Sequence, residues 1–223
     1  MNIKLLFQAL FKMLLGLILV WLLLFISAGS IKYYNGWLLI GLLFIPMFFA
    51  CIFLSFKNPT LLKNRLSSKE KEVKQKKVVL YSGLMFISGF VVAGLNYRFK
   101  WMSLSKTTII ISSVLFLLSY ILYAEVLREN TYLLRTIEVK KNQKLIDNGL
   151  YKIIRHPMYA VTIILFLTMP LILNCPISFV IFFIYPLIII KRIKNEEEVL
   201  ERDLKGYKEY KQRVKYRLIP YIW

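Results

Sequence analysis

The chain turns from polar to apolar in GLYKIIRHPMY, residues 149–159, and this stretch decides how the second half folds. It holds the single histidine of the sequence, His156, between an arginine and a proline. The apolar run that follows, residues 158–190, ends in a second polar cluster that begins at Arg192. This run is too long for one ordinary membrane helix, and Asn174-Cys175-Pro176 interrupts it near the middle. We therefore expect a helical hairpin whose two polar feet lie together and form one site.

The composition indicates an integral membrane protein. Of 223 residues, 58% are hydrophobic, against roughly 45–50% in a soluble domain, and the mean hydropathy is +0.58. The apolar residues form blocks that approach the roughly 20 residues needed to cross a bilayer as a helix. The predicted fold class is therefore all-α, a multi-pass transmembrane helical protein. We expect about six crossings, the C-terminal hairpin included, and a cytoplasmic amphipathic C-terminal helix.

The predicted spans divide the chain into two regions of one membrane domain. The first apolar block would suit a cleaved signal peptide, since Ser27-Ala28-Gly29 offers small residues for cleavage. We favour a retained span, because the block is longer than an ordinary signal core. The predicted N-terminal transmembrane helices occupy residues 1–127, and the C-terminal region occupies residues 128–223. The spans are residues 5–26, 37–56, 78–95, 107–127 and the two hairpin arms within 158–190.

The net charge of +19 fits a membrane surface better than a nucleic acid. The basic residues gather between the apolar blocks, as the positive-inside rule and attraction to anionic headgroups both favour. The loop Lys57–Lys77 and the tail Lys191–Trp223 are both basic, which places both chain ends on the cytoplasmic side. We therefore expect membrane lipids, and no nucleic acid, among the partners.

Two further segments are predicted to lie on the cytoplasmic surface. Residues 128–155 are polar and basic and suit an interfacial position. The tail predicts an amphipathic helix to about Tyr216. In it Tyr207, Tyr210 and Val214 share one face, which would contact either the membrane or the protein.

Three other residues invite a structural reading first. Cys51 and Cys175 lie in apolar context with no CxxC motif and no His/Cys cluster, so we expect buried thiols and no metal site. A single disulfide between them stays open. Glu125 lies near the inner end of a predicted span and is a weak indication of the site, because carboxylates within membranes often serve function.

The polar residues at the two feet of the hairpin gain meaning together. Alone, His156 would be a hydrogen-bonding histidine at the membrane boundary, and Tyr151 and Tyr159 would be interfacial aromatics. Arg192 and Glu196 are four residues apart and would share one helix face. We expect all of them to converge on one pocket at the edge of the apolar core.

The order of these motifs resembles the isoprenylcysteine carboxyl methyltransferase and phospholipid methyltransferase group of integral membrane methyltransferases. That group carries G-x-Y-x-x-x-R-H-P-x-Y, an apolar hairpin, R-x-x-x-E-E-x-x-L and a tyrosine-containing tail that ends before a proline. The resemblance covers roughly residues 136–220, and it departs at Leu204-Lys205, where the group usually has Phe-Gly. The matching residues are Gly149, Tyr151, Arg155, His156, Pro157, Tyr159, Arg192, Glu196, Glu197, Leu200, Tyr207, Tyr210 and Pro220.

The resemblance implies S-adenosyl-L-methionine as the cofactor, held in the cytoplasmic part. It implies that Arg192 binds the methyl acceptor and that Arg192 and His156 are the catalytic residues. A carboxylate acceptor is ionised at neutral pH and needs no general base, whereas an amine acceptor would need one, such as His156. The cofactor-binding residues carried over are Gln143, Lys144, Leu145, Ile146, Tyr151, His156, Pro157, Met158, Tyr159, Glu196 and Glu197.

The implied acceptor is lipid-like or lipid-attached, and carboxyl O-methylation of an isoprenylcysteine-type substrate is our first expectation. Headgroup N-methylation of a phospholipid and methylation of a small thiol stay open. So does a membrane reductase with a nicotinamide cofactor, since reductases acting on sterols carry a similar C-terminal half. A non-enzymatic scaffold for anionic lipids is the remaining alternative. The sequence names neither the acceptor nor the oligomeric state.

Overall fold

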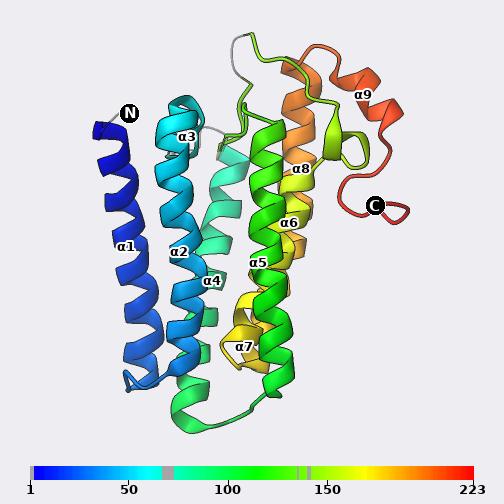
Figure 1. The fold of residues 1–223 in the computed structure, drawn as a ribbon. Coiled ribbons are helices and arrows are strands. Elements are labelled where there is room, and N and C mark those ends of the chain that lie inside the picture. Colours follow the sequence, from blue (N-terminus) through cyan, green and yellow to red (C-terminus); the bar gives the residue numbers. More distant parts are fainter. Residues whose placement is uncertain (1–2, 67–72, 135, 140–141) are drawn as a thin grey trace.

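The computed structural model describes residues 3–66, 73–134, 136–139 and 142–223, and all regular secondary structure in these residues is helical (Figure 1). The elements are α1 (Ile3–Ala28), α2 (Tyr34–Lys57), α3 (Pro59–Leu66), α4 (Val73–Phe99), α5 (Lys106–Glu129), the 3-10 helix η1 (Gly149–Lys152), α6 (Pro157–Ile172), α7 (Pro176–Phe182), α8 (Ile184–Asp203) and α9 (Tyr207–Arg213).

The long helices confirm the predicted multi-pass membrane fold. Within the described residues, five helical stretches are long and apolar enough to cross a membrane, and α6 is a shorter apolar helix. Together they give the six crossings expected, with α6 as one arm of the hairpin and α7 and α8 as the other. The five stretches are Ile3–Ala28, Tyr34–Lys57, Gln75–Phe99, Lys106–Glu129 and Pro176–Asp203.

The bundle collects its polar segments at one end, which we call the site end (Figure 1). The start of α1, helix α3, residues 130–134, 136–139 and 142–156, and the chain after α8 all lie there. The loop predicted at Lys57–Lys77 contains α3 and the start of α4, and its residues 67–72 lie outside the described part. The arrangement brings the start of α1 and the C-terminal tail to one side of the bundle, as the charge pattern predicts.

The turn of the hairpin lies at the opposite end and is held by donors from other helices. Asn174 has a φ of +58°, and the chain reverses there between α6 and α7. The hydroxyl of Tyr33 donates to the carbonyl of Leu173 at 2.6 Å. The side-chain amides of Asn35 and Asn96 donate to two neighbouring carbonyls of the turn, at 2.7 and 3.1 Å. These donors satisfy carbonyls that end a helix inside the bundle, where no lipid group could do so.

Two glycines of α4 allow neighbouring helices to pack closely. A Cβ atom added at Gly94 would lie 2.6 Å from the backbone oxygen of Leu24, and one at Gly89 would lie 2.3 Å from the ring of Phe182. A Cβ at Gly83 would have no atom within 4 Å. Close packing of α4 against α1 and α7 therefore depends on the first two glycines and not on the third.

The C-terminal helix is shorter than the sequence pattern predicts. Helix α8 ends at Asp203, Gly206 takes a φ of +86°, and α9 ends at Arg213 rather than near Tyr216. The predicted common face is present, because Tyr207 and Tyr210 are buried in one apolar cluster with Val214 and Leu204. That face packs on the protein, so α9 is a covering element of the site end.

Candidate functional site

The two feet of the hairpin enclose a cavity at the site end. Its empty volume is about 850 Å³, part of it open to solvent. One wall is formed by residues from 130–134, 136–138 and 143–151, the floor is formed by the start of α6 and the end of α8, and α9 covers the remaining side. Parts of the chain that are far apart in sequence therefore make one pocket.

Most of the residues expected from the sequence line this cavity. Pro157 and Glu197 do not, and the buried carboxylate of Glu197 contacts Arg155, His156 and Arg217 instead. The expected residues that line the cavity are Gln143, Lys144, Leu145, Ile146, Tyr151, His156, Met158, Tyr159, Arg192 and Glu196.

The hydroxyl of Tyr159 joins the two charged cavity residues of α8, Arg192 and Glu196. It donates to Oε2 of Glu196 at 2.5 Å and accepts from Nε of Arg192 at 2.8 Å. The guanidinium carbon of Arg192 also lies 5.9 Å from the centre of the Tyr159 ring. Tyr159 is 5% exposed, so one buried phenol holds a cation and a carboxylate on the same face of α8, as their spacing of four predicts.

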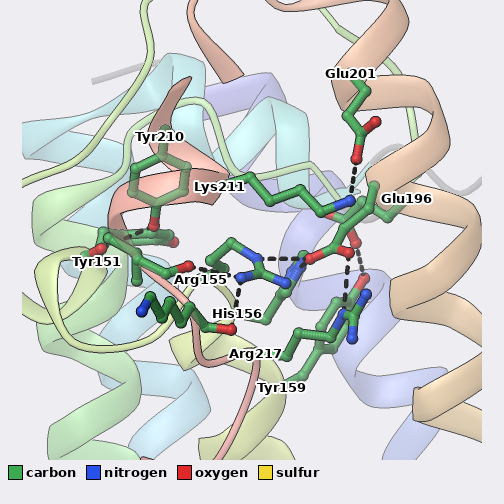
Figure 2. Close-up of polar contacts among 12 residues, drawn as sticks. Tyr151, Arg155, His156, Tyr159, Glu196, Glu201, Tyr210, Lys211 and Arg217 are labelled. Atoms are coloured by element: carbon green, nitrogen blue, oxygen red, sulfur yellow. Dashed lines mark hydrogen bonds and ion pairs between the residues drawn. The ribbon is translucent and has the colours of Figure 1, made fainter. Parts of the chain in front are cut away.

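Glu197, the next residue on α8, is the centre of a buried charge cluster. Its Oε1 accepts from Nε of Arg155 at 2.7 Å and lies 3.2 Å from Nε2 of His156. Its Oε2 accepts from Nε of Arg217 at 3.0 Å. The Glu197 side chain is 4% exposed, and a carboxylate so buried is stable only with such partners. Figure 2 shows Arg155, His156 and Arg217 gathered in this cluster beside the cavity residues Tyr159 and Glu196.

The same arginine fixes the tail of the chain to the site. Nη1 of Arg155 donates to the carbonyls of Val214 and Lys215, at 2.6 and 2.9 Å. The backbone N–H groups of residues 155–156 donate to the carbonyls of residues 216–217, at 2.9 and 3.0 Å. The Arg-His-Pro motif thus docks the segment after α9 as well as bordering the cavity. The sequence carries no spacing signal that pairs these two segments.

The short turn before this motif is built around Glu129. Gly149 has a φ of +53°, and a Cβ placed there would lie 1.7 Å from an oxygen of that carboxylate. The carboxylate accepts from the backbone N–H of Leu150 at 2.9 Å. Tyr210 of α9 donates to the carbonyl of Tyr151 at 2.7 Å, so the covering helix is tied to this turn. A side chain at Gly149 would break that arrangement.

Two hydroxyls of the cavity wall have no hydrogen-bond partner in the part of the chain that the structure describes. The hydroxyls of Thr136 and Tyr207 are buried and make no hydrogen bond among the described residues. Burial raises the pKa of the Tyr207 phenol above its ordinary value, and the nearby carboxylate of Glu197 raises it further. The phenol is therefore a neutral donor at physiological pH. Buried hydroxyls normally have a partner, so these two could serve a polar group placed in the cavity.

Two other expectations have simpler outcomes. Glu125 pairs with Arg128 at 2.5 Å on an exposed surface of α5 and does not line the cavity, so the indication drawn from its position was wrong. Cys51 and Cys175 are both free thiols; Cys175 is buried and Cys51 half-buried.

The fold is that of a multi-pass helical membrane protein, with a cavity at one end of its bundle. Residues 109–202, from α5 to the last turn of α8, match the model of the isoprenylcysteine carboxyl methyltransferase (ICMT) family. The matched region excludes α9 and the docked tail.

The chain is also similar to the Delta(14)-sterol reductase TM7SF2 of Mus musculus. The two are 28% identical over 95 residues, which is 40% of this chain and 22% of the mouse protein. The similarity thus spans about a fifth of that relative. The two comparisons point to enzymes that share one kind of membrane domain.

Proposed function

We propose that the protein is a membrane methyltransferase that uses S-adenosyl-L-methionine and methylates a lipid-like or lipid-attached acceptor at the cytoplasmic face. The observation that carries this proposal is the cavity in which the first foot of the hairpin, from Gln143 to Tyr159, meets Arg192 and Glu196. These are the positions that the ICMT family resemblance assigns to cofactor and acceptor.

The cavity wall has groups suited to each part of S-adenosyl-L-methionine. Glu196 offers a carboxylate for an ammonium group, and Tyr151 and Tyr207 offer aromatic faces and hydroxyls. Thr136 and Tyr207 have hydroxyls that make no hydrogen bond among the described residues and could therefore bind polar groups of the cofactor. The leucine and isoleucine side chains around them would exclude water from an apolar purine face.

The roles of the protein residues follow from this placement. When bound, S-adenosyl-L-methionine supplies a methyl group that passes to an acceptor oxygen as the carbon–sulfur bond breaks, which leaves S-adenosylhomocysteine and a methyl ester. Arg192 would bind and orient the acceptor carboxylate. Tyr159 would fix the directions of Arg192 and Glu196 through its hydroxyl. A carboxylate acceptor requires no base, so His156 would serve chiefly through its contact with Glu197.

The charge pattern supports a cytoplasmic site. The site end carries the basic loops and the basic tail, which the positive-inside rule places in the cytoplasm. The helices of the bundle are apolar, so a lipid-attached acceptor would reach the cavity from the bilayer by passing between them.

The test is the binding of S-adenosylhomocysteine to the purified full chain by calorimetry. We expect binding by the wild type, a loss of at least tenfold in Glu196→Ala, and no loss in Glu198→Ala, which removes an exposed neighbour of the same charge. Absence of binding by folded wild-type protein would refute the cofactor assignment.

A reductase with a nicotinamide cofactor is the second candidate, because the similarity to the mouse sterol reductase favours it. NADPH added to the same calorimetric cell decides between the two. Binding of NADPH without binding of S-adenosylhomocysteine would establish the reductase. If neither binds, an anionic-lipid scaffold is the remaining reading, and lipid binding would then be insensitive to His156→Ala combined with Glu196→Ala.

The acceptor needs its own measurement. Lipid extracts from cells that express the protein would contain new mono- or dimethylated headgroups if a phospholipid amine were the acceptor. Methyl transfer to a small thiol would appear as a thioether in the same cells. Base-labile methyl release from a prenylated cysteine is the result that we expect for carboxyl methylation.

A further inference from the structure

Gln75 of α4 is a buried amide whose nitrogen has no hydrogen-bond partner among the described residues. Its side chain has no exposed surface, and its Oε1 accepts from Nη1 of Arg192 at 3.4 Å. Its Nε2 is buried and has no hydrogen-bond partner among the residues that the structure describes. A buried amide nitrogen carries two N–H donors, and leaving both unmade destabilises the fold. Such a group next to the acceptor-facing arginine indicates that a ligand completes its hydrogen bonds.

We propose that Gln75 and Arg192 together bind the carboxylate of the methyl acceptor, which makes Gln75 a specificity-determining residue. This inference rests on the proposed methyltransferase function. A carboxylate has two oxygens with about four lone-pair sites, enough for a guanidinium and an amide at once. An amine or a thiol acceptor would leave the Gln75 amide unpaired in a buried site, so the pair selects for an acid.

The position of Gln75 explains why this residue has no counterpart in the motifs of the C-terminal half. Gln75 belongs to α4, whereas the match to the ICMT family model covers residues 109–202. Helix α4 packs against α8, which carries Arg192. The N-terminal half of the chain therefore supplies one side of the acceptor site, and the cofactor cavity belongs to the other half.

A purely orienting role for Gln75 is separable from ligand binding by two substitutions. Gln75→Glu keeps oxygens that accept from Arg192 but removes the N–H donor and adds a charge that repels a carboxylate. Gln75→Leu removes both the oxygen that accepts from Arg192 and the N–H donors, and it keeps a side chain of similar size. If Gln75 only orients Arg192, the Glu variant works normally and the Leu variant does not. If Gln75 binds the acceptor, both variants fail.

The experiment measures methyl transfer to N-acetyl-S-farnesylcysteine by the full chain in detergent, with S-adenosylhomocysteine calorimetry on the same preparations. We expect a rise in acceptor KM of roughly tenfold or more in Gln75→Leu and at least as much in Gln75→Glu, with kcat less affected and S-adenosylhomocysteine affinity unchanged. Gln8→Leu, the same substitution at an exposed position of α1, should leave KM as in the wild type. The amide of the same prenylcysteine should inhibit the wild type far more weakly than the acid.

Two results would overturn the inference and leave the methyltransferase intact: a wild-type KM in Gln75→Glu, or equal inhibition by the acid and its amide. A parallel fall in unfolding temperature and cofactor affinity without a change in KM would assign Gln75 a structural role only. Failure of the wild type to bind S-adenosylhomocysteine would instead remove the proposed function, and this inference with it.

Discussion

Arg155 and Glu197 form a buried ion pair, with Nε 2.7 Å from Oε1, although 42 residues separate them in the chain. The pair joins the first foot of the hairpin to α8, and Arg155 at the same time holds two carbonyls of the tail. One contact thus fixes three segments around the cavity. Arg155, the first residue of the Arg-His-Pro motif, thus stabilises the structure around the cavity.

Glu197→Gln should loosen the tail and destabilise the protein. The change removes the negative charge that faces Arg155, His156 and Arg217, and breaking a buried ion pair costs about 3–5 kcal/mol. We expect earlier thermal unfolding in detergent and faster tryptic cleavage after Lys215. Glu198→Gln, one residue further and exposed, is the matched control. Equal cleavage rates in the two variants would contradict the assignment.

Tyr159→Phe should weaken cofactor and acceptor binding while the fold survives. The variant loses only the hydroxyl that connects Arg192 with Glu196, and hydrogen bonds to charged groups contribute about 1.5–3 kcal/mol. The expected result is a loss of roughly tenfold or more in S-adenosylhomocysteine affinity by calorimetry. Tyr81→Phe removes an exposed hydroxyl from α4 and should change nothing. A wild-type affinity in Tyr159→Phe would show that the bridge is dispensable.

Tyr207→Phe tests whether the unpartnered phenol serves the ligand. Its hydroxyl makes no hydrogen bond among the described residues, so its removal should not lower the unfolding temperature, whereas cofactor affinity should fall several-fold. Burial raises the pKa of Tyr207 in the folded protein above the unfolded value of about 10. Titration of this phenol therefore leaves the free energy of unfolding unchanged below about pH 10 and lowers it above that pH. Wild-type affinity should therefore not change through titration of this group between pH 7 and 9. Lower stability with unchanged affinity would refute the role.

Gly149→Ala should destabilise the turn before the Arg-His-Pro motif. The left-handed backbone alone costs a residue with a Cβ about 1–2 kcal/mol, and the added atom would also meet the carboxylate of Glu129. Gly83→Ala is the control, because a Cβ there meets nothing within 4 Å and helical alanine is favourable. Thermal unfolding of both variants in one detergent gives the comparison. Similar midpoints would mean that the turn tolerates a side chain.

Local sequence rules predicted the elements and the meeting of the hairpin feet. Block length gave the membrane spans, the length of the run 158–190 gave the hairpin, and the spacing of Arg192 and Glu196 gave their common face. Glu197 differs from Glu196, although the motif presents them as a pair. Its carboxylate contacts Arg155, His156 and Arg217, and it does not line the cavity.

Other parts of the site depend on tertiary contacts that leave no pattern in the sequence. Gln75 stands among lysines and valines with no motif around it, and it becomes informative only where α4 meets α8. The docking of the tail on Arg155 uses backbone carbonyls, which every residue has, so no side-chain pattern marks it. Glu125 shows the opposite case, because its ion pair with Arg128, three residues further along the same helix, accounts for a carboxylate at this position.

The donors that cap the hairpin turn also affect the order in which the helices can insert into the membrane. Tyr33, Asn35 and Asn96 are made before the turn that they satisfy, since synthesis proceeds from the N-terminus. The turn would enter a bilayer at high cost if those helices were absent. The first helices of this chain therefore supply hydrogen-bond donors that the last helices need when they insert. A chimaera that moves residues 109–202 into another membrane protein would have to bring equivalent donors with it.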